Sequence, residues 1–151
     1  MYKKLFFFLF LLSSCGFKIV TNTNNYKFDD IYISGDKRVN YTLKNKLISS
    51  SNPKSINVIK LNIFTNKEKI IKEKNISNKV TKYEIKINAK VDFAFIKNGM
   101  KDNLTIVKTG FYDVGTRYSE TLNNEKKLTN ILIDRLTKEI IKNLNIALND
   151  S

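Results

Sequence analysis

The chain of 151 residues carries 27 lysine and arginine side chains against 14 acidic ones, which gives a formal net charge of +13. It has no histidine, a single cysteine and five scattered glycines. The sequence therefore lacks the side chain best suited to proton transfer near neutral pH, a His/Cys metal cluster and a glycine-rich phosphate loop. We expect no enzyme, no metal and no cofactor. The excess of cations favours an anionic partner, although a lysine-rich genome composition is an alternative source of it.

The first 15 residues, MYKKLFFFLFLLSSC, have the layout of a secretory signal peptide. Two lysines precede an unbroken apolar run over residues 5–12, and two serines then lead to Cys15. The apolar run spans about 12 Å as a helix, which is too short for the roughly 30 Å hydrocarbon core of a membrane. We expect the run to be removed after export, and outside the cytoplasm we expect no nucleic-acid partner.

The only cysteine follows the two serines, with Leu12 three positions before the expected cleavage point. This order of leucine, two small residues and cysteine is the pattern of a bacterial lipobox, in which the thiol receives a diacylglycerol group before cleavage. We predict a lipoprotein signal peptide over residues 1–14 and a single domain over residues 15–151, lipidated at Cys15 and anchored to a membrane by its acyl chains. The alternative is an ordinary signal peptide with an incidental cysteine.

A strand and a helix are the first elements predicted after the lipobox. Residues 28–34 (FDDIYIS) are typical of a short strand, which Gly35 ends. Residues 36–50 predict an amphipathic helix capped by Asp36, because apolar residues recur at four-residue spacing. These residues are Val39, Leu43 and Leu47.

Two further strands follow, joined by a basic segment. Residues 56–64 are rich in β-branched residues, and residues 67–79 are interpreted as a lysine-dense connector. In residues 82–97 apolar and polar side chains alternate, which predicts a long strand with one buried and one solvated face. The apolar positions are Tyr83, Ile85, Ile87, Ala89, Val91, Phe93 and Phe95.

The last two elements complete the predicted fold. A turn at Asn98 and Gly99 leads into residues 104–114, which predict an antiparallel partner strand with a bulge at Gly110. Residues 124–148 predict a long amphipathic helix. Its apolar stripe comprises Leu128, Leu132, Leu136, Ile140, Leu144 and Leu148, widened by Ile131 and Ile141. We predict an α+β two-layer sandwich, with two helices packed on one face of a mostly antiparallel four-stranded sheet, in the order β-α-β-β-β-α.

In the order of its motifs, the chain resembles the LptE family of lipopolysaccharide-assembly lipoproteins. The resemblance rests on CGFKI at the lipid cysteine, on IYISGD leading into the helix VNYTLKNKL, and on YEIKINAKVDF at the place of the family's long central strand. It continues through TGFYDV into NNEKKLTNILIDRLTKEIIKNL. The resemblance covers nearly all of residues 15–151.

This resemblance implies a non-enzymatic lipoprotein of the outer membrane. Such a protein lies on the periplasmic side, partly inside the lumen of the β-barrel protein LptD, assists the assembly of that barrel and binds lipopolysaccharide. Gly16, rather than an acidic residue, follows Cys15, which under the sorting rule of enteric bacteria suits delivery to the outer membrane. The expected partners are an LptD-like β-barrel protein, lipopolysaccharide and, through the lipid anchor, the outer membrane.

The predicted topology indicates where an anionic lipid would bind. If the strands at 56–64, 82–97 and 104–114 form a meander, the connector before the second strand and the loop after the third emerge at one end. Several cations from the two loops could then face one phosphate group. The candidates are Lys72, Lys74, Lys79, Lys82, Arg117, Lys126 and Lys127. The alternative is a solvated lysine loop without a ligand.

Two other functions fit the same sequence. One is a generic envelope lipoprotein that binds acidic lipid or polysaccharide without a barrel partner. The other is an accessory subunit of a different outer-membrane machine, which would use the solvated face of the sheet as its interaction surface.

Overall fold

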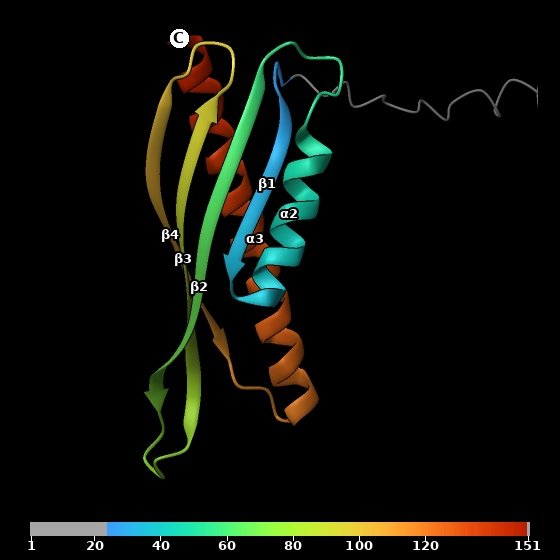
Figure 1. Ribbon diagram of the computed structural model, residues 1–151. Helices are drawn as coiled ribbons and strands as arrows, with labels where there is room; N and C mark the ends of the chain where they lie inside the picture. The colour runs from blue at the N-terminus through green and yellow to red at the C-terminus, as the bar shows by residue number, and fades with distance from the viewer. Residues whose placement is uncertain (1–23, 151) are drawn as a thin grey trace, which may run out of the picture.

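The computed structural model describes residues 24–150, so the predicted signal peptide and Cys15 lie outside the described residues. Four strands form one sheet in the order β1-β2-β3-β4, with β1 parallel to β2 and the other pairs antiparallel. Both described helices cover the same face of this sheet (Figure 1). The elements are β1 (Lys27–Gly35), α2 (Lys37–Ser50), β2 (Val58–Lys74), β3 (Val80–Phe95), β4 (Lys101–Asp113) and α3 (Tyr118–Asn149). The predicted α+β two-layer sandwich and its order β-α-β-β-β-α are confirmed.

The junction between β1 and α2 follows the sequence prediction. Asp36 caps the helix, because its Oδ1 accepts hydrogen bonds from the backbone N–H groups of Arg38 and Val39 at 3.1 and 2.9 Å. Gly35 has a φ of +102°, and a Cβ at this position would lie 1.9 Å from the carbonyl oxygen of Thr65. The turn into α2 therefore requires glycine for both its conformation and its space.

The core lies between the sheet and the helices. The alternation predicted along β3 is confirmed: Ile85, Ile87, Ala89, Val91, Phe93 and Phe95 are buried, and Tyr83 is half-buried. Residues of the other three strands and of both helices complete this core, including Leu61, Leu43 and Leu136. No helix among residues 24–150 combines the length and the apolar character that crossing a membrane requires.

Most of the segment expected to be a connector is strand. β2 continues to Lys74, and its ladder with β3 extends from Ile59–Phe95 to Lys74–Val80. The apolar alternation stops after Thr65, but opposite charges face each other across the strands, as in the pair Glu68–Lys86. Such cross-strand pairs stabilise paired strands without burying apolar side chains. The hydrophobic pattern therefore could not indicate that β2 continues beyond Thr65. The resulting β2–β3 hairpin projects beyond the end of β1 (Figure 1).

The bulge expected at Gly110 is absent. β4 pairs with β3 in unbroken register through Ile85–Gly110. A Cβ on Gly110 would lie 2.7 Å from Cδ1 of Leu128 and 3.4 Å from Cδ2 of Leu132. The missing side chain lets Leu128 of α3 pack directly against the strand backbone, and a methyl group here would require the end of that leucine side chain to move.

Helix α3 begins at Tyr118, six positions before the predicted start. The Glu120 carboxylate caps this first turn, accepting hydrogen bonds from the Thr116 hydroxyl at 2.9 Å and the Arg117 N–H at 3.3 Å. The predicted stripe is buried at Leu132, Leu136, Ile140 and Leu144, and Leu128, Ile141 and Leu148 pack against it.

The role expected for Ile131 was wrong. Its side chain is 46% exposed, and its neighbour Ile133 is 1% exposed and belongs to the core. Residues four positions apart are offset by about 40° around a helix of 3.6 residues per turn, so the apolar row winds slowly around α3. Ile133 lies on the side toward which the row winds and is buried, whereas Ile131 lies on the other side and is exposed.

Candidate functional site: the basic end of the sandwich

The β2–β3 hairpin and the β4–α3 loop lie at one end of the sandwich, and the β3–β4 turn lies at the other (Figure 1). The two loops are joined where Val114 N–H donates to the carbonyl of Thr81 at 2.9 Å. Lys82 is paired with Asp113 in the β3–β4 ladder at this end. The topology on which the predicted anionic-lipid site depends is therefore present.

Three of the predicted site residues already contact other side chains of this protein. Lys72 lies 2.8 Å from the Glu84 carboxylate, and its ammonium is 5.6 Å from the centre of the Phe111 ring. Lys82 lies 2.7 Å from Glu73, a pairing that raises the pKa of the lysine above its usual value. Lys74 donates to the side-chain oxygen of Asn78 at 3.0 Å. Any anion would have to compete with these contacts.

The other four predicted residues are exposed. They are Lys79, Arg117, Lys126 and Lys127. Among residues 24–150, none of the four forms an ion pair. Lys79 lies at the tip of the hairpin, where its backbone N–H donates to Asn75 Oδ1 at 2.9 Å. Their charges are available to a ligand.

The hairpin-tip lysine, Lys79, and the α3 lysines, Lys126 and Lys127, do not converge on one point. Lys126 and Lys127 follow Glu125, whose carboxylate contacts Lys69, and Lys69 pairs with Ile85 in the sheet. The hairpin tip begins at Val80, five residues farther along β3, or about 17 Å away. The structure therefore brings the basic residues to one end of the molecule but spreads them along it.

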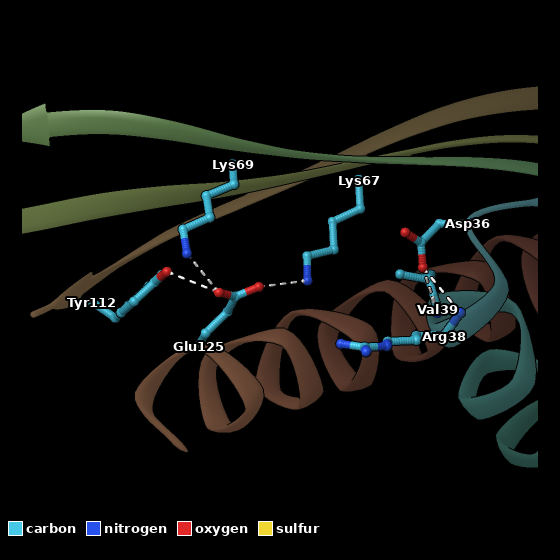
Figure 2. Close-up of polar contacts among 7 residues, drawn as sticks. All are labelled: Asp36, Arg38, Val39, Lys67, Lys69, Tyr112 and Glu125. Carbon is cyan, nitrogen blue, oxygen red and sulfur yellow. Dashed lines mark hydrogen bonds and ion pairs between the residues drawn. The ribbon is translucent and has the colours of Figure 1, made fainter. Parts of the chain in front are cut away.

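A polar cluster at this end was missed by sequence reasoning (Figure 2). The Glu125 carboxylate of α3 lies 3.0 Å from Lys67 Nζ and 2.8 Å from Lys69 Nζ, and it accepts a hydrogen bond from the Tyr112 hydroxyl at 3.1 Å. Lys69 Nζ also lies 4.2 Å from the centre of the Tyr83 ring. The cluster joins β2, β4 and α3 at the level where the apolar core ends.

The cluster holds Glu125 in its charged form. Partial burial raises the pKa of this carboxyl, but the hydrogen bonds from Lys69 and Lys67 outweigh that effect and lower the pKa to about 2. A signal for the cluster was present in the sequence. Lys67 and Lys69 continue the inward-facing odd positions of β2 after Leu61 and Ile63, so two lysines aimed at the helix layer require an acidic partner there.

The described residues offer little else that resembles a catalytic or metal site. Residues 24–150 contain no group of three or more histidine, cysteine or acidic residues placed to hold a metal. The uncovered face of the sheet has an open groove of about 470 Å³, lined by residues of β1, β2, β3 and β4 that include Tyr32, Lys60, Asp92 and Phe93. Its walls carry both charges, without a buried polar group directed into it.

No known family model matches the sequence, and no curated protein has significant sequence similarity to it. Solved structures do match the fold. Rare lipoprotein B from Shewanella oneidensis is similar with a TM-score of 0.63 at 13% identity, over 84% of this chain and 98% of that protein. A lipoprotein candidate from Caulobacter crescentus CB15 gives a TM-score of 0.61 at 13% identity, over 83% and 91% of the two chains. At such identities the likeness shows that this chain shares the fold of these two proteins.

Proposed function

We propose that this chain is a non-enzymatic outer-membrane lipoprotein of the LptE type. In this role it plugs an LptD-like β-barrel protein, assists the assembly of that barrel and binds lipopolysaccharide for insertion into the outer membrane. The observation that carries the proposal is the fold shared with rare lipoprotein B over almost the whole of that protein, in a chain whose residues 12–15 match the lipobox pattern. A second solved structure of the same fold is also described as a lipoprotein.

The geometry of the domain supports this role. The two layers are joined by a continuous apolar core and by the Glu125 cluster, which makes a compact body suited to occupying a pore. One end carries exposed cations that have no carboxylate partner in the described part of the chain, and lipopolysaccharide carries phosphate groups. Lipid attachment at Cys15 would hold the domain at a membrane surface.

Co-purification tests the barrel partner. A tagged full chain, isolated from the membranes of its own organism in mild detergent, should bring down one large β-barrel protein that mass spectrometry identifies as LptD-like. Depletion of the chain should lower the amount of that barrel and of lipopolysaccharide at the cell surface. Isolation of the chain without any barrel protein would instead favour a generic envelope lipoprotein. Recovery of an unrelated machine would favour an accessory subunit.

A further inference from the structure

The outer surface of the helix layer carries two exposed rows of basic and apolar side chains. Both rows lie opposite the buried sides of α2 and α3, at helical spacing. We call them together the helix-layer surface. It consists of Lys37, Tyr41, Lys44 and Ile48 on α2 and of Lys127, Ile131, Arg135, Lys138 and Lys142 on α3, all of which are exposed.

The cations of this surface are not balanced by acidic residues. Residues 37–48 and 127–142 contain eight basic and two acidic side chains. Both acidic side chains are already paired, Asp134 with Lys46 at 2.7 Å and Glu139 with Lys108 of β4. The exposed lysines and arginine that remain form no ion pair among residues 24–150. The surface therefore carries a net positive charge, and the two partly exposed carboxylates within it are held in ion pairs.

The opposite surface of the sandwich differs. On the uncovered face of the sheet, positive and negative side chains are interspersed, and several are paired, as in Lys72–Glu84 at 2.8 Å and Lys60–Asp29 at 3.8 Å. Exposed apolar side chains occur on this face too, for example Phe111 at 56%. The excess positive charge is thus a property of one face and does not follow from composition alone.

We infer that the helix-layer surface docks on an anionic lipid bilayer. Its cations on α3 extend from Lys127 to Lys142, about 22 Å of helix, and a second row on α2 lies beside them. They therefore form an extended array and not a single anion pocket. A plane of lipid phosphates matches such an array in charge and in shape. An open depression of about 520 Å³ gives room for head groups. Arg135, Lys138 and Lys142 line it together with Asn143, Ile146 and Glu139, and Glu139 is paired with Lys108.

The exposed apolar side chains within the array favour a bilayer over a purely polar polyanion. Tyr41 is 73% exposed, Ile48 51% and Ile131 46%. Apolar and aromatic side chains among cations are typical of surfaces that enter the boundary between head groups and acyl chains. This docking depends neither on a barrel partner nor on lipopolysaccharide, so it goes beyond the proposed function.

Tryptophan fluorescence tests the contact, because the chain contains no tryptophan. The full chain would be reconstituted into vesicles of phosphatidylcholine with or without phosphatidylglycerol, carrying either an Ile131→Trp or a Phe111→Trp reporter. We expect the emission of the Ile131→Trp reporter to shift to the blue and to be quenched by brominated acyl chains in the anionic vesicles. The Phe111→Trp reporter on the sheet face should remain solvent-exposed in both vesicle types.

Charge-reversed variants separate specific docking from general attraction. In the Ile131→Trp background, Arg135→Glu, Lys138→Glu and Lys142→Glu together should abolish the blue shift and the quenching. The matched control, Lys90→Glu, Lys97→Glu and Lys101→Glu, changes the net charge equally and should retain both. Circular dichroism melts would verify that each variant is folded. High salt should reverse the shift, because the contact depends on screened charges.

The inference would be overturned by either of two results from folded protein. One is an Ile131→Trp reporter that stays solvent-exposed in anionic vesicles, as expected if an acidic protein covers this face instead. The other is an equal loss of signal in both charge-reversed variants, since net charge alone would then govern adsorption.

Discussion

Lys69 of β2 places its ammonium nitrogen 2.8 Å from a carboxylate oxygen of Glu125 on α3, across the interface between the sheet and the helix layer. Lys67 adds a second cation 3.0 Å from the other oxygen of the same carboxylate. At this level an ionic cluster replaces the apolar contacts that join the layers elsewhere. This one acidic side chain thus links two lysines of β2 to α3.

Replacing Glu125 with Gln should therefore destabilise the domain. The substitution leaves two partly buried ammonium groups without their counter-charge, and we expect a loss of roughly 1–3 kcal/mol in the free energy of unfolding. Chemical denaturation at neutral pH measures it. The matched control is Glu68→Gln on the opposite face of β2, which should cost less than about 1 kcal/mol. Equal losses in the two variants would contradict the role assigned to the cluster.

The same carboxylate makes a pH dependence predictable. The folded-state pKa of Glu125 is lowered from 4.5 to about 2. The carboxylate therefore contributes fully to the free energy of unfolding above pH 4.5, and this contribution is lost as the pH falls from 4.5 to about 2. Unfolding followed between pH 5 and pH 2 should show a steeper loss of stability for the wild-type chain than for Glu125→Gln. Parallel curves for the two proteins would show that the carboxyl titrates normally in the folded state.

Gly35 provides a test of the turn into α2, with Gly99 in the β3–β4 turn as its control. Gly35→Ala places a methyl group 1.9 Å from the Thr65 carbonyl oxygen at a φ of +102°, and it should cost more than about 3 kcal/mol or prevent folding. Gly99→Ala, at a φ of +70° with no atom near the new Cβ, should cost only about 1–2 kcal/mol from backbone strain. Thermal melts of both variants measure the difference. A well-folded Gly35→Ala protein would contradict the close approach of β1 to β2.

The register of β3 predicts opposite effects for neighbouring positions. Ile87 is fully buried, so Ile87→Asp should cost at least about 3 kcal/mol by placing an unpaired charge in the core. Phe93→Asp should behave in the same way. Lys90→Asp, on the solvated face between them, should change stability by less than about 1 kcal/mol. Equal shifts in melting temperature for odd and even positions would overturn the assignment of the buried face.

The sequence correctly predicted those elements in which burial of one face makes apolar residues recur at regular spacing. The alternation in residues 82–97 and the four-residue spacing of Val39, Leu43 and Leu47 both result from one face packing on the core. The end of β2 was missed because its pairs are stabilised across strands, as in Glu68–Lys86, and follow no burial pattern. The Glu125 cluster was missed because residues 67–79, interpreted as a connector, were not expected to direct Lys67 and Lys69 inward, and because Glu125 lies 58 and 56 positions away from them.

The lipid anchor can be tested independently of the fold. Cys15→Ala removes the thiol that the lipobox presents, so cells labelled with a fatty-acid analogue should incorporate label into the wild-type chain and not into the variant. We also expect the variant to accumulate as an unprocessed or mislocalised precursor. Label that persists on Cys15→Ala would refute the lipobox assignment, whatever the fold of residues 24–150.

Lipopolysaccharide binding at the basic end can be assigned to positions by charge reversal. Lys79→Glu and Lys127→Glu together should weaken binding of purified chain to lipopolysaccharide far more than Lys97→Glu with Lys101→Glu, which lie at the opposite end. Each lysine near an anionic surface contributes roughly 1 kcal/mol, so each reversal should raise the Kd at least about fivefold. Titration at fixed ionic strength, with melts to verify folding, measures these changes.

The spacing of the two lysines decides how their effects combine. Because the level of Glu125 and Lys127 lies about 17 Å along β3 from the hairpin tip, the free-energy losses of Lys79→Glu and Lys127→Glu should add in the double variant. Losses much smaller than additive would mean that both ammonium groups hold one phosphate, which requires the hairpin to bend toward α3 on binding. If reversal at the opposite end weakened binding equally, net charge alone would govern the interaction, and a site at the basic end would have to be abandoned.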